Sequence, residues 1–225
     1  MSEIPTVPEA DEVFELPRVQ LTGDDPNALA DLYSIRDDII FAFNCVHAYI
    51  SIVESNQDRS SYEAEYSLTR QSLWNSSIIS YRRAFKSGKA LITPKTSRFS
   101  LDGLVASFNE DQRRVHDELL ETASQHVAHR VGPREQAQIF AFLAPRDQAP
   151  EVRGVSGLNL TMVGPIIESA HEMATLCGRV LEALDSAIDA RETALLNNAR
   201  TRDINDLYAK AVTGPPAVQQ GPTTG

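Results

Sequence analysis

The residues best suited to proton transfer lie together in residues 123–129, which read ASQHVAH at the end of a helical pattern. His126 and His129 stand three residues apart there, in a chain that has five histidines in all. The imidazole has an unperturbed pKa close to neutrality, so it can take up and release a proton under physiological conditions. Ser124 adds a hydroxyl group to the same stretch. We therefore take His129, Ser124 and His126 as the candidate catalytic residues.

This stretch resembles the helix-terminal motif of HEPN proteins, all-helical domains that often act as RNA-cleaving toxins. In that family an arginine, usually followed by a polar residue, stands four to six positions before a histidine. Here His129 matches the histidine and Ser124 the polar residue, whereas Ala123 stands at the arginine position. The resemblance implies RNA cleavage by internal attack, in which the histidine moves a proton and the arginine holds the phosphate. Because alanine supplies neither charge nor donors, we expect this activity to be silent or weakened.

Other predicted helices continue the resemblance, which covers residues 27–200. Leu73-Trp74 and residues 79–88 look like the second-helix signature of a group of mostly uncharacterised bacterial HEPN-like proteins. His116, followed by Leu119-Leu120, looks like the third-helix pattern of the same group. The family implies an all-helical fold, and it implies that two protomers often pair so that both motifs face one cleft.

Basic side chains are concentrated in one part of an acidic chain. The formal net charge is −10, and the first 25 residues hold seven acidic residues against Arg18 alone, a net charge of −6. Residues 66–101 hold seven basic residues and no Asp or Glu. This distribution fits either a solvated helix face with a basic loop or a local anion-facing patch. The residues that we expect to bind RNA or another anion are Arg70, Arg82, Arg83, Lys86 and Arg130.

Other chemistries lack their sequence signatures. The isolated Gly88, Gly103 and Gly164 match no phosphate-binding loop, and two cysteines alone cannot make a zinc site. We therefore expect no cofactor and no metal. Cys45 and Cys177 fall in helical apolar stripes, which favours buried thiols in a reducing cytosol. No apolar run approaches the ~20 residues that span a bilayer, and the N-terminus is acidic, so we expect a cytoplasmic protein without a membrane role.

The elements that must position these residues are mainly helical. Apolar residues recur every three or four positions from Asp25-Pro26-Asn27 to Val53, which predicts a long amphipathic helix. A second helix is predicted from Ser60 or Ser61 to Gly88. Further helices are predicted over residues 101–108 and 110–126 and after Gly164-Pro165.

Residues 136–164 break the helical period. Residues 139–143 suit a strand, and residues 158–163 alternate between apolar and polar positions, which together predict a β-hairpin. Because a lone hairpin is only marginally stable, we expect it to lie on the helices. The predicted fold class is all-α: a four-helix up-and-down bundle with a β-hairpin inserted between the third and last long helices. This domain would occupy residues 27–204, between an acidic disordered arm at 1–26 and a flexible tail at 205–225.

Three functions follow from these observations. The first is a catalytically silent or weakened HEPN-like protein that binds RNA or protein, in the stress, toxin–antitoxin or phage-conflict setting that the resemblance implies. The second is an active metal-independent HEPN-type ribonuclease that uses His129 with a substitute cation. The third is a structural or regulatory homodimer without a nucleic-acid role.

We favour the first function and lean against enzymatic activity. We also expect a homodimer with residues 116–130 at or beside the interface, because the predicted apolar faces are broader than one neighbour needs. If the missing arginine alone silences the site, Ala123→Arg should restore a cation beside His129 at modest structural cost.

Overall fold

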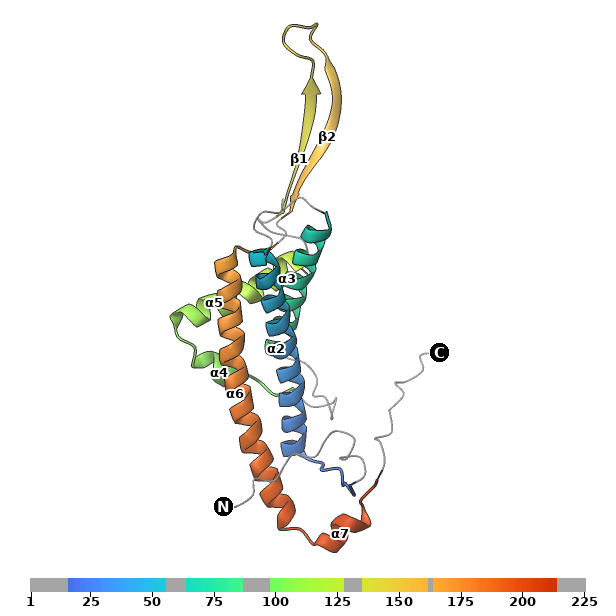
Figure 1. Ribbon diagram of the computed structural model, residues 1–225, viewed down its shortest axis with the longest axis vertical. Coiled ribbons are helices and arrows are strands. Elements are labelled where there is room, and N and C mark those ends of the chain that lie inside the picture. The colour runs from blue at the N-terminus through green and yellow to red at the C-terminus, as the bar shows by residue number, and fades with distance from the viewer. Residues whose placement is uncertain (1–15, 56–63, 87–97, 128–134, 162–163, 214–225) are drawn as a thin grey trace.

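The computed structural model describes residues 16–55, 64–86, 98–127, 135–161 and 164–213, and these residues are mainly helical. The longest elements are α2 (Asp24–Ser55), α3 (Ala64–Phe85) and α6 (Ile167–Arg200). Figure 1 shows them running alongside one another, and α2 is central because it packs against both α3 and α6. The shorter α5 (Glu110–Thr122) contacts α3 and α6. The prediction of a mainly helical fold with an inserted hairpin is confirmed.

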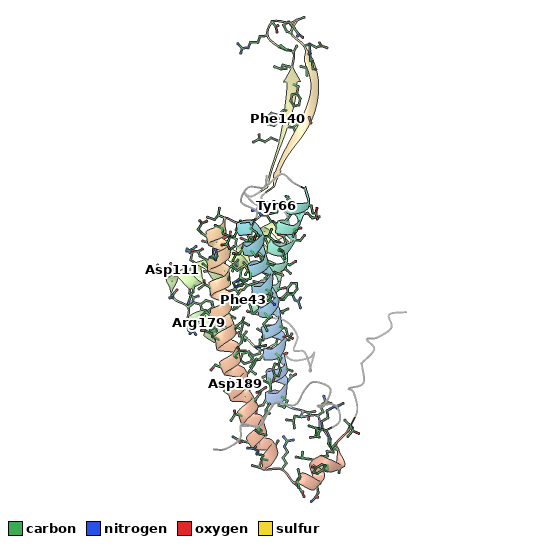
Figure 2. All side chains as sticks on the ribbon, viewed as in Figure 1. Phe43, Tyr66, Asp111, Phe140, Arg179 and Asp189 are labelled. Carbon is green, nitrogen blue, oxygen red and sulfur yellow. The ribbon has the colours of Figure 1, made fainter. Side chains whose placement is uncertain are left out.

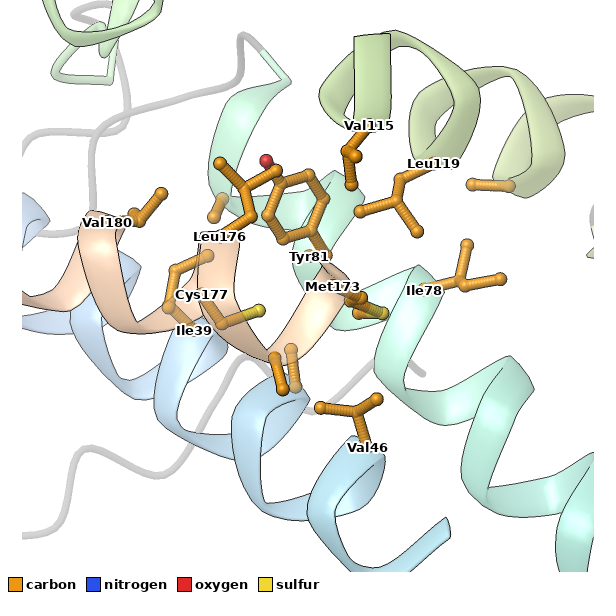
Figure 3. Packing of buried hydrophobic residues seen from close by; sticks show 14 of the residues in the cluster. Ile39, Val46, Ile78, Tyr81, Val115, Leu119, Met173, Leu176, Cys177 and Val180 are labelled. Atoms are coloured by element: carbon orange, nitrogen blue, oxygen red, sulfur yellow. The ribbon is translucent and has the colours of Figure 1, made fainter. Parts of the chain in front are cut away.

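The core forms where the apolar stripes of four helices meet. Figure 3 shows Ile39 of α2, Ile78 of α3, Leu119 of α5 and Met173 of α6 packing into one cluster. Ile39, Ile78 and Met173 are completely buried. Burying a side chain of this size contributes roughly 1.5–3 kcal/mol, so this cluster is the main source of the stability of the fold.

Helix boundaries follow local capping rules. Gly23 has φ of +118°, a left-handed conformation that favours glycine, and its carbonyl accepts a hydrogen bond from the N–H of Asn27 at 3.1 Å. α5 begins with a reciprocal capping box, in which the N–H of Gln112 donates to Asn109 Oδ1 at 2.8 Å and the N–H of Asn109 donates to Gln112 Oε1 at 3.1 Å. The predicted first residues of the second helix and its predicted stop at Gly88 lie outside the described residues.

Both ends of the described chain differ from the predicted disordered arm and flexible tail. A short helix, α7 (Ile204–Ala209), covers the first residues of the predicted tail. The N–H of Arg18 donates to the carbonyl of Val212 at 3.0 Å, and the N–H of Val212 donates back at 2.8 Å. Backbone pairing between segments far apart in the chain leaves no periodic pattern in the sequence. The prediction of disorder at both ends therefore depended on composition alone. Residues 1–15 and 214–225 lie outside the described residues.

The hairpin has the predicted position in the chain but not the predicted packing. Strands β1 (Glu135–Leu143) and β2 (Val152–Thr161) pair antiparallel between α5 and α6. The expectation that the hairpin lies on the helices is wrong, because it projects away from their end (Figure 1). Ile139 is 73% exposed and Leu143 is 68% exposed. The strands pair with each other over their whole length, so they leave the helices together as one ribbon.

Candidate functional site

The motif lies on a widened helical turn. α5 continues into a π-helical turn, η1 (Ala123–Val127), a distortion that is frequent at functional sites. The hydroxyl of Ser124 donates to the carbonyl of Leu120 at 3.0 Å, so its hydrogen is used within the helix. His126 belongs to this turn, whereas His129 and Arg130 lie outside the described residues. The role of His129 therefore stays a prediction.

Ala123, at the position of the family arginine, is a core residue. Its side chain is 0% exposed, and it lies one helical turn beyond Leu119 on the buried side of α5. An arginine there would enter the apolar cluster, and an unpaired buried charge is very costly. In place of a modest structural cost, we therefore expect a large one for Ala123→Arg.

A cleft of about 650 Å³ opens next to this turn, at the hairpin end of the helices. Its apolar lining comes from four helices and includes Val53 of α2, Trp74 of α3, Leu119 of α5 and Ile167 of α6. Trp74 is 93% buried, so the cleft exposes only a small part of its ring system. Concave sites with an apolar floor and a few polar groups are the usual form of binding sites in proteins.

Of the predicted anion-binding residues that the structure describes, Arg70 lines this cleft. Its guanidinium carbon lies 5.5 Å from the centre of the Tyr49 ring and 5.2 Å from the centre of the Tyr66 ring, within cation–π range of both. Its Nη2 donates to Tyr49 Oη at 3.1 Å. Among the described residues its buried Nε has no hydrogen-bond partner. Two aromatic rings therefore hold the guanidinium in one orientation at the wall of the cleft.

Tyr49 also fixes the segment that begins α6. Its hydroxyl donates to the carbonyl of Pro165 at 2.7 Å. The preceding residue, Gly164, packs so closely on Tyr49 that an added Cβ would lie 2.6 Å from the hydroxyl oxygen. A glycine is required here by this close approach, which ties the start of α6 to the last two turns of α2.

Three carboxylates line the same cleft: Glu118 of α5 and Glu168 and Glu172 of α6. Arg114, on the exposed face of α5, makes ion pairs with Glu118 at 3.2 Å and with Glu172 at 2.6 Å. With Arg114 included, three carboxylates face two arginines at the cleft, which leaves a net charge of −1. Sequence reasoning missed them because they come from two helices about 50 residues apart, although the four-residue spacing of Glu168 and Glu172 places both on one helix face.

Three of the other predicted basic residues, Arg82, Arg83 and Lys86, lie at the far end of α3. Lys86 is ~24 Å from Arg70 along the helix, at ~1.5 Å per residue. Arg83 makes an ion pair with the buried Asp38 at 3.0 Å, and Arg98 approaches the other oxygen of the same carboxylate at 3.5 Å. Arg82 is partly buried. The structure therefore separates Arg70 from these three residues, and Arg83 is engaged in an ion pair with Asp38.

His116 is buried, not solvated at the helix surface. It is 96% buried, and its Nδ1 lies 2.9 Å from Tyr81 Oη. The rings of Phe85 and Phe108 contact the imidazole edge to face at centroid distances of 4.6 and 5.6 Å. Burial lowers the pKa of His116, so the neutral imidazole is favoured. This arrangement fits a structural hydrogen bond inside the core.

Within the described residues, no group of three or more His, Cys, Asp or Glu side chains could hold a metal ion. Cys45 and Cys177 are buried free thiols, and burial raises the pKa of Cys177 to about 12. None of the described helices has the length and apolar character that crossing a membrane requires. Comparison of the chain with protein-family models, curated proteins and solved structures finds no match.

Proposed function

We propose that this protein is a catalytically silent HEPN-like four-helix bundle, and that it works by binding a protein partner in the cleft beside η1. The observation that carries the proposal is the complete burial of Ala123 in the core. A HEPN-type ribonuclease needs a cation beside its histidine to hold the phosphate, and the position that supplies it in the family faces the interior here. The chain therefore cannot cleave RNA by a mechanism that needs an arginine at position 123.

The charges around the cleft favour a protein over RNA. Glu118, Glu168 and Glu172 line it, and Arg70 together with Arg114 offsets two of these three charges. A nucleic-acid backbone carries a negative charge at every phosphate, and its affinity for a protein comes largely from neutralisation by Lys and Arg. An acidic lining repels such a backbone and attracts a basic side chain. Arg70 also has its cationic face covered by Tyr49 and Tyr66.

The shape and lining of the cleft indicate the chemistry of the partner. The apolar floor at Trp74 and Leu119 suits an aliphatic or aromatic side chain, and the carboxylates suit a neighbouring Lys or Arg. We therefore infer a partner segment with an apolar anchor next to a basic residue. The stress, toxin–antitoxin or phage-conflict setting is a proposal that rests on the family resemblance alone.

An assay with structured and unstructured RNA, with a metal chelator present, tests the proposal that the protein has no ribonuclease activity. We expect no cleavage, and binding to labelled RNA no tighter than that of an acidic control protein at the same salt concentration. Cleavage that disappears in His129→Ala would contradict the proposal and support the metal-independent ribonuclease.

Selection from a displayed library of random short peptides tests the binding part. Selected peptides should carry an apolar residue beside Lys or Arg. Glu168→Arg and Glu172→Arg should each weaken their binding at least tenfold, about 1.4 kcal/mol, through charge repulsion. Glu182→Arg is the matched control, because Glu182 lies on the same helix ~20 Å from Glu168 and outside the cleft lining. Equal binding by all three variants would exclude the cleft as the binding site.

A further inference from the structure

The hairpin arm, residues 135–161, exposes apolar side chains on both of its faces. Phe140 and Phe142 share one face, because alternate residues of a strand point to the same side. Ile139, Leu143 and Val155 lie on the other. Phe142 is 54% exposed and Val155 is 68% exposed, and Figure 2 shows Phe140 on the arm well beyond the helices. An exposed apolar surface of this kind marks an interaction site.

The pairing register leaves the two phenylalanines uncovered. Phe140 lies opposite Ser156 and Phe142 lies opposite Gly154, so β2 places only small residues directly opposite the two rings. A two-stranded ribbon also has an unpaired backbone edge along each strand. A second strand beside β1 would satisfy that edge and cover the rings at the same time.

The two edges of the arm differ in how well they are protected. From Gln136 to Leu143, β1 has no charged residue, no glycine and no proline. β2 carries Arg153, Gly154 and Gly157, and its pairing shifts by one residue between Phe142 and Leu143. Charges, glycines and register irregularities are features that discourage further strand pairing. The open edge is therefore that of β1.

We propose that the arms of two copies of this chain pair through β1, antiparallel and edge to edge, in a four-stranded sheet that holds a closed homodimer. This proposal stands apart from the cleft and does not rest on the function proposed for it. β1 can pair with itself without placing like charges opposite each other, because its residues 136–143 are uncharged. The phenylalanines of the two copies then meet across the twofold axis as aromatic cross-strand pairs.

The size and direction of the arm suit this assembly. The arm projects along the long axis of the molecule, so a twofold axis through it lays two arms side by side in opposite directions (Figure 1). Six large side chains of the arm are 42–73% exposed. Four of these six side chains belong to β1 and lie beside the proposed seam: Ile139, Phe140, Phe142 and Leu143. Backbone hydrogen bonds along β1 add to this.

The same pairing connects the arm to the motif region. β1 is ~30 Å long at ~3.3 Å per residue, so pairing centred near Phe140 or Ala141 brings each turn to the base of the other arm. That base lies at the end of the helices where the cleft opens (Figure 1), and Thr122 in the lining of the cleft directly precedes η1. The protected edges of β2 then face outward, and the assembly closes at two copies.

Light scattering at tens of micromolar tests the dimer, and a matched pair of lysine variants tests its edge. Ala141 and Val155 lie directly opposite each other on one face of the arm. Ala141→Lys places a charge at the proposed interface and should raise the dissociation constant at least tenfold. Val155→Lys places the same charge on the outer strand and should leave the dimer intact. A monomeric wild-type chain, or equal effects of the two variants on the dissociation constant, would overturn the proposal. An unchanged helical circular dichroism spectrum verifies that each variant is folded.

A scan of single cysteines at residues 138–142 supplies the second test. Equivalent residues of two antiparallel copies move apart by ~6.6 Å for each step from the twofold axis. Disulfide formation needs Cα atoms within about 7 Å, so one position near Phe140 or Ala141 should cross-link and its neighbours should not. The native Cys45 and Cys177 are buried, so we expect little cross-linking through them. Cross-linking at alternate positions would indicate face-to-face packing and contradict edge pairing.

Discussion

Tyr81 Oη lies 2.9 Å from His116 Nδ1 inside the helical core, and this hydrogen bond joins α3 to α5. Both partners are buried, Tyr81 completely. Burial raises the pKa of Tyr81 and lowers that of His116, so both groups are held neutral. A buried polar pair of this kind is stable only while neither group takes a charge.

The pair makes the stability of the protein sensitive to acid. Since the folded-state pKa of His116 lies below its unfolded value, the unfolded chain binds the proton more readily. The free energy of unfolding should therefore fall as the pH drops below about 6.5, the ordinary histidine pKa. Melting curves between pH 7.5 and pH 5 should show a smaller fall for His116→Gln than for the wild type. Tyr81→Phe, which keeps the imidazole, should lose stability at neutral pH but retain the fall, and an unchanged fall in His116→Gln would refute this assignment.

Gly164 and Gly178 form a matched pair of substitutions. Gly164→Ala places a Cβ 2.6 Å from Tyr49 Oη, so it should destabilise the fold by about 1–3 kcal/mol through overpacking. At Gly178, within α6, nothing lies within 4 Å of an added Cβ. Gly178→Ala should therefore stabilise the fold by up to about 1 kcal/mol through helix propensity. Denaturant unfolding measures both, and a loss of stability in Gly178→Ala would contradict the packing described for α6.

Ala123→Arg tests whether the motif position belongs to the core. We expect a loss of at least ~3 kcal/mol in unfolding free energy, and no RNA cleavage by the fraction that remains folded. The matched control is Gln125→Arg in the same turn, where Gln125 already contacts Glu121 at 2.7 Å and an arginine can keep that contact. Thermal unfolding and an RNA cleavage assay provide the measurements. A stable Ala123→Arg protein that cleaves RNA would contradict this prediction and support a ribonuclease site that lacks only its arginine.

The two arginines that share Asp38 should contribute unequally. The side chain of Arg98 is 14% exposed and also donates to the Arg83 carbonyl at 3.0 Å, whereas the Arg83 side chain is 64% exposed. Exposed ion pairs contribute roughly 0–1 kcal/mol, and breaking a buried one costs about 3–5 kcal/mol. Urea unfolding should therefore show a larger loss for Arg98→Ala than for Arg83→Ala. The opposite order would mean that the ion pair between Arg83 and Asp38 contributes more to the free energy of unfolding than the ion pair between Arg98 and Asp38.

Local patterns in the sequence determined the helices. The apolar spacing in α2 predicted the buried side of that helix, where Leu32, Ile35 and Ile39 are completely buried. Asn109 and Gln112 lie at the spacing of a capping box, and α5 begins with that box. The hairpin was predicted from the change of period after Pro133. Each of these features depends on residues within a few positions of one another, so one sequence is enough to reveal them.

Tertiary structure alone decided what the site contains. The sequence could not show that Ala123 faces the core, because a helix has the same local pattern whichever neighbour covers it. It could not show that Glu118 and Glu168 meet at one cleft, or that Asp38 pairs with Arg83, because these partners come from different helices. Whether the hairpin packs on the helices depends on which helix surfaces remain uncovered once the helices have packed against one another. Contacts between distant segments follow from the whole packed arrangement, and no local period encodes them.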